Sequence, residues 1–273
     1  GYLFRDGEPE PYNDYDYFLV FRGLGRTGIR AIAPEIETLA HDLTDRVGVE
    51  VDLALIGVEP LRRAPFNLMN AEMLWGHRVV AGNPDVLSVM PRMPFHELSP
   101  GEFTRLMNNR GSLLLMNARR LASGGPVRDD ERDVFFKYLF KAVLACGDAR
   151  LAVAGSYHPS YVRKRENLAD PGERCDEGFL SLYDLALEQK FHPDAKRLAG
   201  LSPTDYQQQA VNTWLETFQG LETARTGRPV GDWEAYARVG VDRGQLERGS
   251  VLRNTAIGLR DFPPAHLLRH PSW

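Results

Sequence analysis

Cysteine is scarce in this sequence: only Cys146 and Cys175 occur among 273 residues. They form no C-x-x-C pair and lie at no Cys/His ligand spacing. This excludes a structural zinc site and the disulfide framework of a small secreted protein. Such sparse use of cysteine is typical of a reducing compartment, so we expect a cytoplasmic protein.

An excess of positive charge and long apolar runs are also missing. Lys and Arg total 33 against 37 Asp and Glu, which gives a net charge of −4, and no segment has the dense basic character of a nucleic-acid-binding arm. No apolar run reaches the roughly 18 residues that cross a bilayer. We therefore expect neither duplex DNA nor a membrane as a partner.

Three common catalytic patterns are absent. The sequence has no Walker motif, no G-x-S-x-G and no H-E-x-x-H, and its seven histidines show no pair at ligand spacing. These absences disfavour a P-loop enzyme, a serine hydrolase of that type and a metal site built on imidazole.

The first third of the chain has the pattern of a small α/β unit. After an irregular lead-in over 1–13, the sequence predicts a strand at 15–21, a helix at 34–48 and a second strand within VEVDLALIGV (49–58). A helix near 66–75 and a short strand at 78–81 are expected to follow. The proline-marked stretch MPRMPFHELSP indicates a domain boundary there.

Beyond about residue 100, apolar residues follow helical spacing in three long stretches, 103–122, 131–155 and 204–225. The last segment, 261–273, is too rich in proline for a helix. The predicted class is therefore α+β, with a small mixed sheet in a domain over 1–95 and a helical bundle over 96–273.

Three carboxylates mark the α/β unit. Asp14 and Asp16 open the first strand on the same face, with Cα atoms roughly 6.5–7 Å apart, and Asp52 lies within the second strand. Like charges this close are costly unless one is protonated or a cation lies between them. Mg²⁺ prefers carboxylate and phosphate oxygens, so these residues are candidate metal ligands.

A D-x-D that opens a strand, a helix, and an acid inside the next strand (VEVDLAL) together resemble the nucleotidyltransferase superfamily, of the DNA polymerase β-like or minimal type followed by a helical domain. The resemblance implies transfer of a nucleoside monophosphate from an NTP, with ATP the expected donor, to a hydroxyl acceptor. Asp14 and Asp16 would hold Mg²⁺ or Mn²⁺, and Asp52 would complete the cluster as general base. The acceptor stays open: a small molecule, a protein or RNA.

The resemblance has one departure. The family carries a Gly-Ser turn shortly before the D-x-D, and none precedes Asp14 here. Either that turn lies upstream of Gly1, which we expect, or the chain is a non-catalytic nucleotide-binding module of the same fold.

A glycine-rich segment supports a further alternative. GLGRTG places Gly23, Gly25 and Gly28 in a G-x-G-x-x-G pattern between a strand and a helix, as in NAD(P)-binding Rossmann oxidoreductases. The mid-strand position of Asp52 and the helical second half argue against this assignment.

Candidate nucleotide-binding residues lie in the helical half. Lys137 and Lys141 are one turn apart on a predicted helix, so both can face a triphosphate, and Arg110 is a weaker candidate. Tyr157 is a candidate to stack on the base, in the segment SYHPSYVRKR. That segment also contains a second tyrosine, a histidine and three basic residues that can meet phosphates: Tyr161, His158, Arg163, Lys164 and Arg165.

Overall fold

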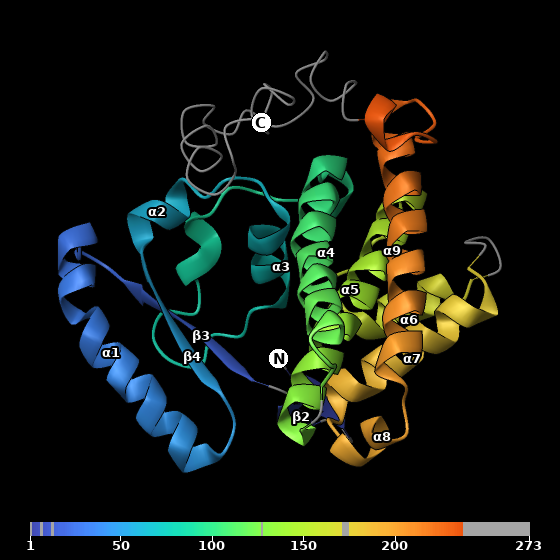
Figure 1. The fold of residues 1–273 in the computed structure, drawn as a ribbon. Helices are drawn as coiled ribbons and strands as arrows, with labels where there is room; N and C mark the ends of the chain where they lie inside the picture. Colours follow the sequence, from blue (N-terminus) through green and yellow to red (C-terminus); the bar gives the residue numbers. More distant parts are fainter. Residues whose placement is uncertain (1, 6–7, 12–13, 127, 171–174, 237–273) are drawn as a thin grey trace, which may run out of the picture.

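The structure is a computed structural model and describes residues 2–5, 8–11, 14–126, 128–170 and 175–236. The expected tail at 261–273 lies outside this part of the chain. Strands β3 (Tyr15–Phe21) and β4 (Val51–Gly57) pair in parallel, joined by helix α1 (Arg26–Val47). Both predicted strands are confirmed. The pair lies between α1 and the remaining helices (Figure 1).

The sheet differs from the small mixed sheet that was predicted. β1 (Tyr2–Arg5) and β2 (Glu8–Pro11) form an antiparallel hairpin of their own, within the stretch expected to be irregular. The predicted strand at 78–81 is wrong, because this segment has no strand structure and Val80 is exposed. Its β-branched pair lacks a neighbouring strand with which to form a ladder.

Helix α1 begins eight residues earlier than predicted. Pro34 suggested a helix start, because proline is favoured in the first turn, yet it lies inside the helix. Gly25 is the N-cap residue, so Gly28 belongs to the helix and not to a loop. Only the front half of GLGRTG is therefore a turn, with Gly23 at φ +77°.

Short helices connect the strand pair to the rest of the chain. They are α2 (Val58–Arg62), α3 (Leu68–Gly76), η1 (Val86–Val89) and η2 (Phe95–Glu97). Helix α3 confirms the helix expected near 66–75, and the Asn67 side chain caps it by accepting from the backbone N–H of Asn70. The buried Glu102 accepts a hydrogen bond from the Leu68 backbone N–H at 3.0 Å, which joins α3 to the following helix.

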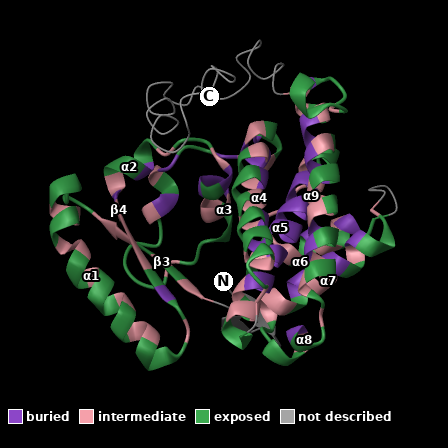
Figure 2. Cartoon of the chain, in the orientation of Figure 1, coloured by how far each residue is buried: buried purple, intermediate pink, exposed green. Residues whose placement is uncertain are grey.

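The second half is a bundle of helices. Its members are α4 (Pro100–Ala122), α5 (Asp129–Ala154), α6 (Tyr161–Leu168), α7 (Glu177–Phe191), α8 (Ala195–Ala199) and α9 (Pro203–Thr226). Helix α5 runs through the centre and is buried along most of its length (Figure 2). Gly147 permits a close approach, because a Cβ there would lie 2.3 Å from Cε2 of Tyr183. The three long helices predicted from periodicity are confirmed.

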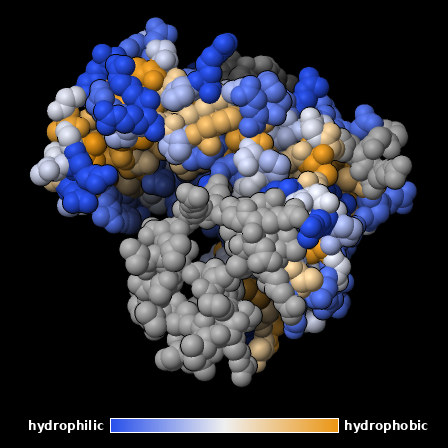
Figure 3. All heavy atoms as spheres, turned by 90° about the horizontal axis from the view of Figure 1, so that it is seen from above, coloured by the Kyte–Doolittle hydropathy of each residue, from blue (hydrophilic) through white to orange (hydrophobic). Residues whose placement is uncertain are grey.

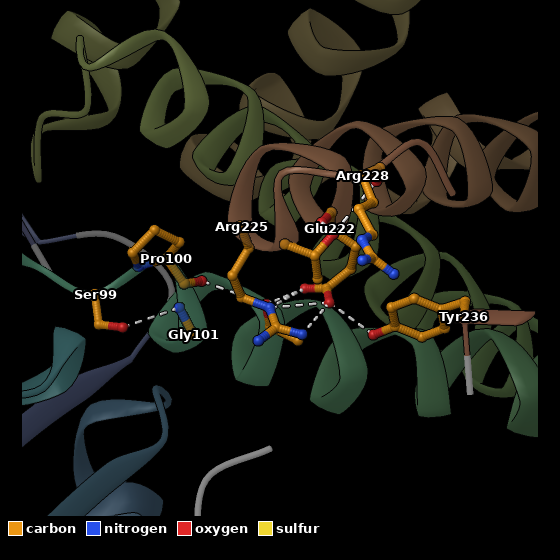
Figure 4. Close-up of polar contacts among 9 residues, drawn as sticks. Ser99, Pro100, Gly101, Glu222, Arg225, Arg228 and Tyr236 are labelled. Carbon is orange, nitrogen blue, oxygen red and sulfur yellow. Dashed lines mark hydrogen bonds and ion pairs between the residues drawn. The ribbon is translucent and has the colours of Figure 1, made fainter. Parts of the chain in front are cut away.

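A buried carboxylate connects α9 to its surroundings. Glu222 is fully buried and accepts hydrogen bonds from Arg225 (2.9 Å), from the Tyr236 hydroxyl (2.7 Å) and from Thr104 of α4 (Figure 4). Burial alone would raise the pKa of Glu222, but these three donors lower it below its usual value. The contact therefore fixes α9 against α4 with an ionised acid.

The described helices and strands thus form an α+β protein dominated by helices, as the class was predicted. No helix in the described ranges has the length and apolar character needed to cross a membrane.

Candidate functional site

The carboxylates of β3 and β4 meet through strand register. Asp16 pairs directly with Asp52 across the two strands, and both residues are exposed. The α1 side of the sheet is identified by Gly57, where an added Cβ would lie 3.6 Å from Cδ1 of Ile29. Because side chains alternate along a strand, Asp16 and Asp52 occupy the opposite face, toward the helical bundle.

Asp14 extends this acidic face. It lies two residues before Asp16, and the intervening Tyr15 donates its backbone N–H to the carbonyl of Glu50 at 2.8 Å, which fixes the chain at this point. The pKa of Asp16 is raised by its partial burial and then by the negative charges of Asp14 and Asp52. The three predicted acids therefore repel one another at short range. We call Asp14, Asp16 and Asp52 the acidic face.

The fit of this face to a divalent metal rests on a pair of carboxylates. Across the described ranges, no three His, Cys, Asp or Glu side chains are arranged as a group that can hold a metal ion. Mg²⁺, however, commonly uses one or two carboxylates and takes its other ligands from phosphates and water. Asp16 and Asp52, in register and exposed, are of the right kind for that role.

A basic cavity lies among the helices next to the acidic face. Its volume is about 510 Å³, and it is bounded by parts of α3, α4, α5, α7 and α8 and by Tyr161 of α6. Arg110, Lys137 and Lys141, all predicted from the sequence, line it together, and Lys190 of α7 adds a fourth cation. Four acids also line it: Glu72, Asp133, Asp148 and Asp194. We call this space the basic cavity.

The electrostatics connect the cavity with the acidic face. Burial lowers the pKa of Lys141, and the charges of Lys137 and Arg110 lower it further, whereas Asp14 acts in the opposite direction. The pKa of Lys190 is also lowered by burial, with Asp14 and Asp16 opposing that shift. The acids of β3 and the cations of the cavity are thus close enough to affect one another's charge.

Lys190 was not among the predicted residues. It lies near the end of α7 and is the only cation of that helix, whose charged residues are otherwise acidic. That single cation is the only signal that the sequence of the helix offers. Its partners come from distant parts of the chain, so no local pattern indicates them.

Tyr157 is not among the residues that line the cavity. Its ring packs edge-on against Phe103 at 5.0 Å between centroids and lies 5.8 Å from Phe95. Its hydroxyl donates a hydrogen bond to Glu72. The predicted base-stacking residue is therefore part of the wall behind the cavity.

Lys164 is also placed differently from its predicted role. Its side chain is 1% exposed, and its ammonium lies 2.7 Å from Asp148 and 3.6 Å from Glu72. The rings of Tyr157 and Tyr161 flank it at 4.8 and 4.7 Å. Lys164 thus pairs with the buried Asp148 and the half-buried Glu72, and it is not accessible to a phosphate.

Asp148 and Glu72 bring this buried network to the cavity, because both line it. Burial raises the pKa of Asp148 to about 6, although Lys164 opposes the shift. A carboxyl group that lines the cavity is a hydrogen-bonding group for a bound ligand.

The other predicted residues of this segment have local partners. Arg163 forms an exposed ion pair with Glu166 at 2.8 Å, and Arg165 pairs with Asp184 of α7. His158 packs edge-on against Trp75, and burial lowers its pKa.

The glycine-rich segment lies at the opposite end of the strands from the acidic face. β3 and β4 are the only parallel strands found in the described ranges, whereas a dinucleotide-binding sheet needs further parallel strands beside them. The sheet described here does not provide the Rossmann site considered from the sequence.

The chain matches no protein-family model, and neither the curated proteins nor the solved structures contain a significant match to it.

Proposed function

We propose that the protein is a metal-dependent nucleotidyltransferase that moves a nucleoside monophosphate from an NTP, with ATP as the expected donor, onto a hydroxyl acceptor. One observation carries the proposal: four cations from three helices line a single cavity, together with four acids, beside a face of three carboxylates. A triphosphate with a bound metal ion needs both the cations, which bind its oxygens, and the carboxylates, which bind the metal.

The cations and the carboxylates have different roles in this proposal. Arg110, Lys137, Lys141 and Lys190 bind the triphosphate oxygens. Asp16 and Asp52, with Asp14 beside them, would hold Mg²⁺, which supplies positive charge to the phosphates undergoing transfer.

In the proposed reaction one P–O bond forms, one breaks and one proton is transferred. The acceptor oxygen bonds to the α-phosphorus, the bond from that phosphorus to the bridging oxygen breaks, and pyrophosphate leaves. The proton of the acceptor hydroxyl passes to the carboxylate of Asp52, whose exposure leaves it accessible to the acceptor.

Thermal unfolding with each NTP, and with NAD, in the presence and absence of Mg²⁺ tests the proposal. A ligand at 100 times its Kd adds about 2.7 kcal/mol to the free energy of unfolding. We expect an NTP to stabilise the protein only with Mg²⁺, and Asp16→Asn and Lys141→Gln to abolish the effect. Glu37→Gln, an exposed acid in the middle of α1, which packs on the opposite side of the strands from the acidic face, is the matched control and should respond as the native chain does. Stabilisation by NAD without Mg²⁺ would contradict the proposal.

A second candidate is a nucleotide-binding regulatory module. It is favoured by the observation that, across the part of the chain the structure describes, the acids form no three-ligand metal group. Release of pyrophosphate from a bound NTP, measured with candidate hydroxyl acceptors, separates the two: a transferase releases it, and a sensor binds the NTP unchanged.

A further inference from the structure

A second cavity lies where β3 and β4 end and α1 and α2 begin. Its volume is about 720 Å³, and it is lined by the residues that follow each strand. Asp16 is near the start of β3 and Arg22 comes just after its end, so roughly 20 Å of strand, at 3.3 Å per residue, separates them. This cavity is therefore distinct from the acidic face and from the basic cavity. We call it the arginine pocket.

Four arginines line the arginine pocket: Arg22, Arg26, Arg30 and Arg62. The single acid in its lining, Glu59, forms an ion pair with Arg62 at 3.4 Å. Arg22, Arg26 and Arg30 form no ion pair within the described part of the chain. Such a concentration of positive charge is unexpected in a chain with a net charge of −4.

The positions of these arginines destabilise helix α1 when no ligand is bound. Arg26 and Arg30 are four residues apart on α1, where like charges destabilise a helix. Arg26 also lies in the first turn, which contains no acid and has no side-chain cap, although negative charge is preferred at that end. A bound anion would relieve both unfavourable terms.

The remaining lining is apolar. Leu24, Ile29 and Val58 line the pocket together with Gly57, where an added Cβ would lie 3.3 Å from Cδ of Pro60. Seen from above, hydrophilic residues surround a few apolar ones on the side of the molecule formed by α1 and α2 (Figure 3). The volume is in the range of small-molecule sites, which combine an apolar lining with a few placed polar groups.

We propose that the arginine pocket binds the phosphate of a small phosphorylated molecule, whose apolar or planar body lies against Leu24 and Ile29. The guanidinium group presents paired N–H donors in a fixed plane that matches two phosphate oxygens. Several arginines without ion-pair partners around one cavity therefore favour a phosphate over a neutral ligand. This site needs no metal and is independent of the proposed transferase activity.

Calorimetric titration with inorganic phosphate, pyrophosphate and a nucleoside monophosphate, in EDTA and at constant ionic strength, tests the proposal. We expect binding that persists in Lys141→Gln, because that variant alters only the basic cavity. Arg26→Gln and Arg30→Gln should each weaken binding about tenfold, as for the loss of one charge-assisted hydrogen bond. Arg46→Gln, at the other end of α1, is the matched control and should bind as the native chain does.

Several outcomes would overturn the proposal. The first two are equal binding by the native chain and the Arg26→Gln/Arg30→Gln variant, and loss of binding in Lys141→Gln. The others are an equal response to sulfate, and binding of a single-stranded RNA oligonucleotide without binding of any small phosphate. If the glutamine variants unfold prematurely, Arg26→Lys and Arg30→Lys replace them: they keep the charge but lack the planar fork, and they should still weaken binding.

Discussion

Asp148 is a single residue whose charge state should affect the stability of the whole protein. Its pKa is raised from 3.8 to about 6 in the folded chain, so the folded state holds this proton more tightly than the unfolded state. We expect the free energy of unfolding to fall as the pH rises from about 4 to about 6, by roughly 3 kcal/mol at about 1.4 kcal/mol per pKa unit. Urea unfolding at several pH values measures this change.

The variant Asp148→Asn separates this effect from the other titrating groups. It also removes the partner of Lys164, which costs stability at every pH. The decline between pH 4 and 6 that Asp148 causes should be missing from the variant, so it should appear in the difference in free energy of unfolding between the two proteins. A difference that does not change with pH would contradict the prediction.

The residues that sequence analysis identified are those whose role depends on their own helix or strand. Lys137 and Lys141 are one turn apart on α5, so their common direction followed from spacing alone. Tyr157 and Lys164 were assigned to ligand binding because they lie in a polar segment. Their burial depends on Phe95, Phe103 and Asp148, which belong to other elements and leave no signal in the segment itself.

Pro34 makes α1 a test of helix energetics at the scale of an element. It lies in the helix interior, where proline donates no backbone hydrogen bond and costs about 3 kcal/mol. Pro34→Ala should therefore raise the midpoint of thermal unfolding and increase the helical signal in circular dichroism. An unchanged or lower midpoint would show that Pro34 stabilises the folded state in another way.

Pro203 is the matched control for that prediction. It occupies the first turn of α9, where its missing N–H would have no partner in any case. Pro203→Ala should change the midpoint little.

At the element scale, periodicity predicted the long helices and the two parallel strands, because apolar residues recur along one face of each at regular spacing. The strand at 78–81 was wrong for a related reason. A strand needs a neighbour for its backbone groups, and the residues of the segment do not specify one. The hairpin of β1 and β2 was missed because its glycine- and proline-rich composition is typical of irregular chain.

The whole molecule shares a hydrophobic core between the strand unit and the bundle. Leu61, Leu68 and Ala71 belong to the same buried cluster as the apolar side chains of α4 and α5, and Val20 and Ile56 pack against it. The division at residue 95 stays a prediction, but these contacts cross it.

We therefore expect the two halves to unfold in one transition. In a variant that keeps only Trp75, on α3, and in one that keeps only Trp214, on α9, fluorescence and circular dichroism should give the same midpoint. Leu68→Ala should lower the free energy of unfolding by about 2–5 kcal/mol, with the same value from both tryptophan signals. Two separate midpoints would indicate domains that fold independently.

The register of β3 and β4 also limits how this chain can change in evolution. Asp16 and Asp52 share a face only because each strand keeps its residue count up to that point. One residue inserted between Val51 and Asp52 would turn the second carboxylate toward α1. Selection that preserves the acidic face would thus act on deletions and insertions in these strands, and loops elsewhere would be free to vary in length.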